Sequence, residues 1–233
     1  MRKIVIALPK TARLLGKAYE IFKRAGYNCP ALEDEIKNNV RKQLEFCTDE
    51  VVYLLVTNDD IPQYVDRNWA DLGITAFDCY REYELSSMST GGPMRGDNFI
   101  SDLLPDMGLC QGARFCIAGL PQARAFYERC KTNDEKILTA ATTYPGIAAN
   151  FFRRKGILAD IVSIRGSSEL MPLHSSAEVI FDIVETGRAL KENGLEIFEE
   201  AMPLVSKILV SKAAYKYDEN IVKMIEVLKN AIK

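Results

Sequence analysis

A polar turn that follows an apolar segment has the residue types best suited to chemistry in this sequence. Residues 178–190 read EVIFDIVETGRAL, an apolar strand that ends in Asp182 and Glu185 before the chain turns through Thr186 and Gly187 into a helix. The first turn of a helix offers unpaired backbone N–H groups and the positive end of the helix dipole. Thr186 adds a hydroxyl donor, and Gly187 lets the backbone approach a ligand closely. Such donors are the requirements of a phosphomonoester site.

The acidic residues before this turn add a second kind of chemistry. The carboxylates of Asp182 and Glu185 could bind ribose hydroxyls or a Mg²⁺ ion, and the helix that follows carries Arg188. A structural alternative is a capped helix that follows a buried strand. Local chemistry alone leaves both interpretations open.

Other kinds of site find less support. His174 is the only histidine, which leaves little room for a histidine-based metal centre or a Ser-His-Asp triad. Six cysteines are scattered without a C-x-x-C pair, so we expect reduced thiols in a cytoplasmic protein rather than a zinc site or a disulfide framework. Residues 86–98 are rich in glycine and serine but lack both common phosphate-loop patterns, so we interpret them as a loop that crosses between lobes.

Composition indicates a globular protein with no general affinity for polyanions. The chain has 233 residues, of which 48% are hydrophobic and 27% charged, enough for one large domain or two small ones. Its net charge of −2 gives no electrostatic footprint for nucleic-acid or membrane binding. No apolar run reaches the roughly 20 residues that a membrane-spanning helix needs. The opening MRKIVIALPK predicts a first strand rather than a secretion signal, because its apolar part is short.

Strands and helices alternate along the chain and would position the turn. Apolar runs predict strands at residues 3–8, 51–56 and 71–75, and later near 114–119, 137–142, 160–165, 179–184, 195–197 and 206–211. Helical periodicity predicts helices at 14–25 and near 64, 77–83, 122–131, 146–155 and 167–174, with a last one capped by Asp218. This alternation predicts an α/β fold with a mainly parallel sheet.

An ordered set of motifs resembles one known family. The motifs are Ala7-Leu-Pro-Lys10 with Arg13-Leu14, Arg41-Lys42, Asp60-Ile-Pro62, Asp71-Leu-Gly-Ile-Thr75, Ala141-Thr-Thr-Tyr144-Pro145, Gly166-Ser167-Ser-Glu169 with Pro172 (compare G-S-V-E-x-A-P), and the stretch from Ile180 to Leu190. Single motifs of this kind are weak, but six in register with the stretch from Ile180 to Leu190, at compatible spacing, make chance an unlikely cause. The sequence resembles the ATP phosphoribosyltransferases, the first enzymes of histidine biosynthesis.

The resemblance implies a fold and a domain division. The family fold is a two-lobed α/β structure of the periplasmic-binding-protein type (type II), with the active-site cleft between the lobes. Lobe I would comprise residues 1–90 and 190–233, and lobe II residues 91–189, which carry the phosphoribosyl pyrophosphate loop. Long members add a C-terminal regulatory domain, whereas this chain ends one helix after Ser211 and resembles the short form.

The resemblance also implies an activity and its partners. The reaction joins N1 of ATP to C1′ of phosphoribosyl pyrophosphate and releases pyrophosphate. Mg²⁺ would be held through the substrate phosphates rather than by protein side chains. The expected assembly is a homo-oligomer such as a dimer, or a hetero-oligomer with a regulatory subunit resembling histidyl-tRNA synthetase. Neither nucleic acid nor a membrane is expected as a partner.

Site roles follow from the matched motifs. The resemblance implies catalytic roles for Arg13, Arg41 and Glu169. ATP would contact Lys10, Arg13 and Tyr144. Phosphoribosyl pyrophosphate would be bound by Asp182, Glu185, Thr186, Gly187, Arg188 and Ala189. Tyr144 could instead be a packing residue at a helix start, and Glu169 could cap a short helix.

Departures from the family pattern keep two other functions open. Thr57 stands where the family usually has an arginine, Ser175 where it has a glycine, and Ala189 where it has a threonine. Smaller differences are Ala12 for a glycine and Glu178 for an aspartate. One alternative is a relative that uses phosphoribosyl pyrophosphate with a different acceptor. The other is a non-catalytic binding protein that kept the two-lobed fold.

Overall fold

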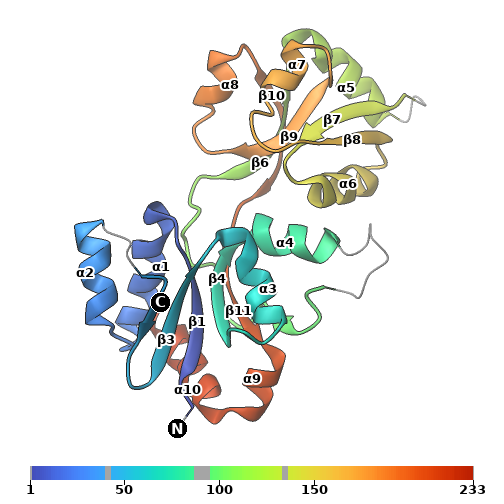
Figure 1. Ribbon diagram of the computed structural model, residues 1–233. Coiled ribbons are helices and arrows are strands. Elements are labelled where there is room, and N and C mark those ends of the chain that lie inside the picture. Colours follow the sequence, from blue (N-terminus) through green and yellow to red (C-terminus); the bar gives the residue numbers. More distant parts are fainter. Residues whose placement is uncertain (1, 40–42, 87–94, 133–135, 233) are drawn as a thin grey trace. The chain divides into compact units, whose positions relative to one another are not determined.

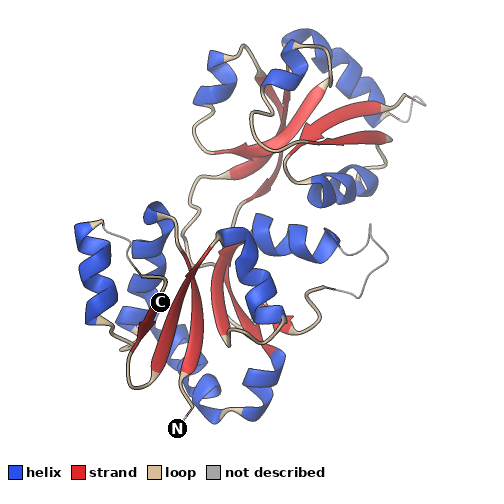
Figure 2. Cartoon of the chain, in the orientation of Figure 1, coloured by secondary structure: helices blue, strands red, loops and turns tan. Residues whose placement is uncertain are grey.

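The computed structural model describes residues 2–39, 43–86, 95–132 and 136–232. The chain divides into two compact units: unit 1 comprises Met1–Cys110 and Val205–Lys233, and unit 2 comprises Gln111–Leu204. Each unit contains one β-sheet with helices against it (Figure 1 and Figure 2). The α/β class predicted from the sequence is confirmed.

Unit 1 is built on a six-stranded sheet with the order β2-β3-β1-β4-β11-β5. Its strands are β1 (Ile4–Pro9), β2 (Glu45–Cys47), β3 (Val51–Val56), β4 (Leu72–Ala76), β5 (Phe99–Ile100) and β11 (Ser206–Ser211). β1 runs parallel to β3 and β4, whereas β2, β5 and β11 pair antiparallel with their neighbours. The sheet is therefore mixed, and the prediction of a mainly parallel sheet was wrong. The parallel pair β1–β3 is connected through α1 and α2, as parallel strands require a long crossover.

Helices cover both faces of the sheet in unit 1. They are α1 (Ala12–Arg24), α2 (Pro30–Asn38), α3 (Ile61–Asp66), α4 (Phe77–Ser86), α9 (Lys212–Tyr217) and α10 (Glu219–Ala231), with a 3₁₀ turn, η1 (Asn58–Asp60). Ile6 and Leu8 of β1 belong to the core formed with α1 and α10, whereas Ala7 belongs to the core formed with α3 and α4. This alternation follows from the two-residue period of a strand.

Gly73 on β4 lets α3 pack directly against the sheet. A Cβ atom at this position would lie 2.6 Å from Cγ2 of Ile61 and 2.9 Å from Cγ2 of Val65. Non-bonded carbon atoms are most stable at about 3.5–4.0 Å, so a side chain here would push the helix away. The glycine of the D-L-G-I-T segment thus has a packing role.

Unit 2 is built on a five-stranded sheet with the order β10-β6-β9-β7-β8. Its elements are β6 (Arg114–Gly119), η2 (Pro121–Ala123), α5 (Arg124–Lys131), β7 (Leu138–Thr142), α6 (Pro145–Arg154), β8 (Ala159–Ser163), α7 (Leu170–Leu173), β9 (Val179–Val184), α8 (Arg188–Glu192) and β10 (Glu196–Pro203). β7 runs parallel to β8 and β9, and β6 runs antiparallel to β9 and β10. This sheet is mixed as well.

The two faces of the sheet in unit 2 have different cores. On one face the rings of Phe115 and Phe181 stack with centroids 5.1 Å apart, and Phe152 of α6 packs on Phe181. The opposite face carries small and aliphatic residues such as Cys116 and Ile180, which pack with α8. Asp182 alternates with Phe181 along β9, so it belongs to the second face.

The observed unit boundaries differ from those predicted at 90/91 and 189/190. Residues 95–110 lie in unit 1 because β5 pairs with β11 there. Residues 190–204 lie in unit 2 because β10 pairs with β6 across almost its whole length. The chain crosses between units at Cys110–Gln111 and Leu204–Val205, after the segments that the sequence singled out.

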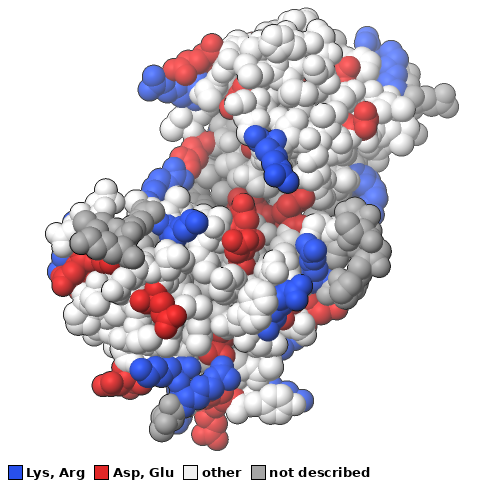
Figure 3. All heavy atoms as spheres, viewed as in Figure 1, with Lys and Arg blue, Asp and Glu red and all other residues white. Residues whose placement is uncertain are grey.

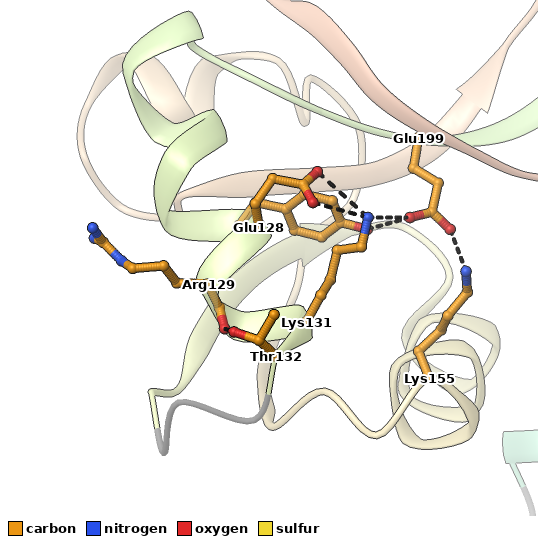
Figure 4. Close-up of polar contacts among 7 residues, drawn as sticks. Glu128, Arg129, Lys131, Thr132, Lys155 and Glu199 are labelled. Atoms are coloured by element: carbon orange, nitrogen blue, oxygen red, sulfur yellow. Dashed lines mark hydrogen bonds and ion pairs between the residues drawn. The ribbon is translucent and has the colours of Figure 1, made fainter.

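An ion-pair network joins β10 to the helices of unit 2 (Figure 4). The Glu199 carboxylate accepts from Lys155 Nζ at 2.6 Å and from the Tyr127 hydroxyl at 2.9 Å. Lys131 Nζ lies 3.4 Å from the same carboxylate and 3.1 Å from that of Glu128. Glu199 therefore links β10 with both α5 and α6.

Charged side chains of both signs are mixed on the surface (Figure 3), and the described cysteines form no disulfide. Basic and acidic side chains are interspersed over each unit on the face drawn in Figure 3. All six cysteines lie among the described residues, and none of them forms a disulfide. In the described ranges, the helices are all too short or too polar to cross a membrane.

Candidate functional site

A pocket of about 270 Å³ in unit 2 collects most of the residues singled out in the sequence. It is formed by the end of β9, the turn after it, α8, and the residue before α7. Its lining consists of Glu169, Ile180, Asp182, Ile183, Val184, Glu185, Thr186, Gly187, Arg188, Ala189 and Leu190. The structure thus brings together all six residues predicted to bind phosphoribosyl pyrophosphate, along with Glu169.

Asp182 supplies a half-buried carboxylate to this lining. Its Oδ2 accepts a hydrogen bond from the Ser168 hydroxyl, and its Oδ1 accepts one from the N–H of Ile183 at 2.7 Å. Burial raises the pKa of Asp182 above its ordinary value, although both hydrogen bonds act in the opposite direction. β9 continues two residues beyond Asp182, so this carboxylate projects from within the strand and not from its end.

The turn after β9 supplies hydrogen-bond donors. Gly187 has φ of +72°, a left-handed conformation that favours glycine. The N–H of Arg188 donates to the Thr186 hydroxyl oxygen at 3.4 Å, which leaves the hydroxyl hydrogen for a ligand. α8 has only five residues, so its dipole adds little. The turn is therefore suited to a phosphate by its individual donors, the Thr186 hydroxyl and the backbone N–H groups, and not by a helix dipole.

Arg188 has an exposed guanidinium that pairs within its own helix. Its Nε lies 2.6 Å from a carboxylate oxygen of Glu192, and its side chain is 83% exposed. An exposed pair of this kind is weak, so the guanidinium can turn toward an anion at small cost.

Arg114 supports the turn from the neighbouring strand. Its guanidinium donates to the carbonyl of Glu185 at 3.4 Å and to that of Gly112 at 3.3 Å, and its Nε lies 2.6 Å from a carboxylate oxygen of Glu200. These contacts join β6, β10 and the start of the turn. This role could not be predicted from the sequence, because Glu185 and Glu200 lie 71 and 86 residues away along the chain.

Tyr144, predicted to contact ATP, lies at the same edge of the sheet as the end of β9. The strand that precedes it, β7, runs parallel to β9, so both strands end at that edge. The ring of Tyr144 meets Phe115 edge-on with centroids 5.1 Å apart. A packing role at the start of α6 is therefore observed; the nucleotide contact stays a prediction.

The predicted basic residues belong to unit 1. Lys10 directly follows β1, and Arg13 lies in the first turn of α1; both are exposed. Arg41 lies outside the described residues. Within the described ranges, no three His, Cys, Asp or Glu side chains gather in a way that could hold a metal ion.

Comparison with known proteins decides the family. The family model of HisG, ATP phosphoribosyltransferase, matches residues 57–231, three quarters of the chain. The chain belongs to the ATP phosphoribosyltransferase family. The matched range contains every residue that lines the pocket, whereas Lys10, Arg13 and Arg41 precede it.

Curated ATP phosphoribosyltransferases align with the whole chain. The protein of that name from Lachnoclostridium phytofermentans is 35% identical over 100% of this chain and 98% of its own length. That from Clostridioides difficile is 34% identical over 99% of this chain and 100% of its own. These relatives therefore have nearly the same length as this chain, as expected for the short form.

Solved structures share the fold. The ATP phosphoribosyl transferase (HisG:HisZ) complex from Thermotoga maritima contains a chain with a TM-score of 0.68 and 24% identity, with 98% of both chains covered. The periplasmic VFT2 domain of Bordetella pertussis BvgS has a TM-score of 0.51 at 11% identity, covering 98% of this chain and 86% of its own. Both likenesses concern the fold, and the predicted type II fold of periplasmic binding proteins is confirmed.

Proposed function

We propose that this protein is an ATP phosphoribosyltransferase that transfers the phosphoribosyl group of phosphoribosyl pyrophosphate to N1 of ATP. This is a pentosyl transfer and the first step of histidine biosynthesis. The observation that carries the proposal is the pocket at residues 180–190, which lies within the matched family range and combines phosphate donors with carboxylates.

The chemistry of this transfer suits the residues of the pocket. Positive charge develops at C1′ of the ribose while negative charge builds on the departing pyrophosphate. Such a reaction depends on positioning and on charge complementarity more than on a protein nucleophile. The Thr186 hydroxyl and the backbone N–H groups of the turn would hold the 5-phosphate, and Asp182 would accept hydrogen bonds from the ribose hydroxyls.

The other assigned roles rest on the motif resemblance. Lys10 and Arg13 carry exposed cationic groups that could contact polyphosphate, and we extend the same proposal to Arg41. Glu169 lines the pocket and would lie close to the sugar. Tyr144 would contact the base of ATP.

Magnesium would enter with the substrate. Mg²⁺ commonly binds substrate phosphates, one or two carboxylates and several waters, and Glu169 and Glu185 bring carboxylates to this pocket. When bound, the ion would neutralise charge on the departing pyrophosphate. The HisG:HisZ neighbour supports, for this chain, assembly with a regulatory subunit. We propose that this subunit resembles histidyl-tRNA synthetase.

A product assay tests this proposal. The purified protein, alone and with the proposed regulatory subunit, is incubated with ATP, phosphoribosyl pyrophosphate and Mg²⁺. The products are separated by chromatography and identified by mass spectrometry. We expect phosphoribosyl-ATP and pyrophosphate in equal amounts. Absence of phosphoribosyl-ATP under both conditions would contradict the proposal.

The same assay distinguishes the alternatives. Pyrophosphate release with another nitrogenous acceptor, and not with ATP, would identify a divergent phosphoribosyltransferase. Tight binding of a small solute without affinity for phosphoribosyl pyrophosphate would identify a binding protein. The largely intact Thr186-Gly187 turn favours the first of these over the second.

A further inference from the structure

Ser168 is a buried polar residue that reaches the pocket only through another side chain. It is 2% exposed, and its hydroxyl donates to Oδ2 of Asp182. The loop that carries it is held in an uncommon conformation, because the preceding Ser167 has φ of +49°. Left-handed conformations of residues other than glycine are infrequent and concentrate at functional sites.

The hydrogen bonds at Asp182 fix the plane of its carboxylate. Oδ2 accepts from Ser168 on the loop before α7, and Oδ1 accepts from the N–H of Ile183 at 2.7 Å. An ionised carboxylate has about four lone-pair positions. Oδ1 and Oδ2 can therefore each accept one more hydrogen bond. Because Asp182 lines the pocket, a ligand there can supply the donors.

We propose that Ser168 is a positioning residue for sugar recognition, which holds the Asp182 carboxylate so that its two oxygens accept the two hydroxyls of a ribose diol. This inference rests on the proposed function of the pocket, and it adds a residue outside the pocket lining. Without the Ser168 hydroxyl, the carboxylate would keep only the Ile183 N–H as a fixed partner and could rotate.

The surroundings of Asp182 make this hydrogen bond more important. Glu169 carries a like charge nearby and, with burial, disfavours the ionised carboxylate, whereas the Ser168 hydroxyl favours it. Glu185 and Arg188 lie in the same pocket lining, and Cys116 of β6 is paired with Asp182 across the sheet. Ser168 is thus one of two hydrogen-bond donors that hold Asp182 in the form able to accept from a diol.

A pair of nearly isosteric variants isolates the hydroxyl. Ser168→Thr keeps the hydroxyl and adds a methyl group, whereas Ser168→Val has the same shape with a methyl group in place of the hydroxyl. The G-S-V-E motif that this loop resembles carries valine at the same position, so the loop should accept this shape. Any difference between the two variants then reports the hydrogen bond to Asp182.

Calorimetry with two probes gives the readout. Ribose 5-phosphate carries both the diol and the phosphate, and inorganic phosphate carries the phosphate alone. We expect Ser168→Val to bind ribose 5-phosphate about tenfold more weakly than Ser168→Thr, the order of effect that a hydrogen bond to a charged group has. Both variants should bind inorganic phosphate as the parent chain does. Equal affinities of the two variants for ribose 5-phosphate would overturn the inference. So would an equally large loss of affinity for inorganic phosphate in Ser168→Val.

A double-mutant cycle shows whether Ser168 acts through Asp182. In an Asp182→Asn background, exchanging threonine for valine at position 168 should change the affinity for ribose 5-phosphate less than twofold, because coupled residues are not additive. A full tenfold effect in that background would contradict the inference. If the parent chain itself binds neither probe, the proposed site is wrong and the role of Ser168 falls with it. If the parent chain binds both probes but the two variants bind ribose 5-phosphate with equal affinity, only the role of Ser168 is rejected and the proposed site stands.

Discussion

Thr186 is the side chain of the turn that a bound phosphate would contact most directly. Its hydroxyl oxygen already accepts from the N–H of Arg188, so the hydroxyl is oriented before a ligand arrives. Because Thr186 is exposed, its removal should cost the fold little. Binding and folding can therefore be separated at this residue.

Thr186→Ala is expected to weaken phosphoribosyl pyrophosphate binding about tenfold to a hundredfold, since a hydrogen bond to a charged group contributes about 1.5–3 kcal/mol. Thr186→Ser keeps the hydroxyl and should bind nearly as the parent chain does. Calorimetric titration gives both affinities, and circular dichroism shows that the variants are folded. An unchanged affinity in Thr186→Ala would make the turn a structural cap.

At the scale of elements, the turn between β9 and α8 depends on the conformation of Gly187. A Cβ atom there would meet only Cγ1 of Val184, at 3.8 Å, an ordinary contact. Space therefore does not exclude a side chain. The constraint is φ of +72°, which asparagine tolerates better than alanine does and which a β-branched residue tolerates least.

Substitutions at Gly187 should therefore follow backbone preference and not side-chain size. We expect affinity for phosphoribosyl pyrophosphate to fall in the order Gly, Asn, Ala, Val, although asparagine is larger than alanine. Left-handed backbone costs about 1–2 kcal/mol for ordinary residues. Equilibrium titration of Gly187→Asn, Gly187→Ala and Gly187→Val gives the order, and stronger binding by the alanine variant than by the asparagine variant would contradict the conformational explanation.

The ion pairs that attach β10 to α5 and α6 should make the stability of the fold depend on pH. Burial alone would raise the pKa of Glu199, but the contacts with Lys155, Tyr127 and Lys131 outweigh it and hold the pKa below the ordinary value of 4.5. A depressed pKa in the folded state means that the carboxylate stabilises the fold above its unfolded-state pKa. That stabilisation is lost as the pH falls through the folded-state pKa.

Glu199→Gln should consequently destabilise the protein at neutral pH and less so in acid. The variant leaves two partly exposed lysines beside a neutral amide, and loss of an ion pair at this exposure costs about 1 kcal/mol. Denaturant unfolding should show a constant deficit between pH 8 and about pH 6, which shrinks below about pH 4.5. Glu128→Gln, at an exposed carboxylate of the same network, is the matched control and should have a small effect. A Glu199→Gln deficit that persists unchanged in acid would rule out the charge explanation.

At the scale of the whole molecule, local sequence patterns predicted the residues that line the pocket better than the residues that hold them in place. The Thr186-Gly187 turn and Glu169 could be found because each belongs to a contiguous motif. Ser168 and Arg114 could not be assigned roles, because their hydrogen bonds reach residues 14 and 71 positions away. Contacts of that kind leave no periodicity in the sequence.

The domain division shows the same limit. The glycine-rich loop at 86–98 suggested a boundary, yet the chain afterwards returns to pair β5 with β11 in unit 1. β10 was predicted as residues 195–197 only, because charged residues such as Glu199 and Glu200 interrupt the apolar pattern. As an edge strand, β10 can carry charged side chains that a central strand would exclude.

The most direct test of this account is a crystal structure of the protein with phosphoribosyl pyrophosphate and Mg²⁺. We expect the 5-phosphate on the turn, within hydrogen-bond distance of the Thr186 hydroxyl and the backbone N–H groups of residues 187–189, with the ribose hydroxyls on Asp182. Phosphoribosyl pyrophosphate bound elsewhere, with this turn unoccupied, would contradict the account.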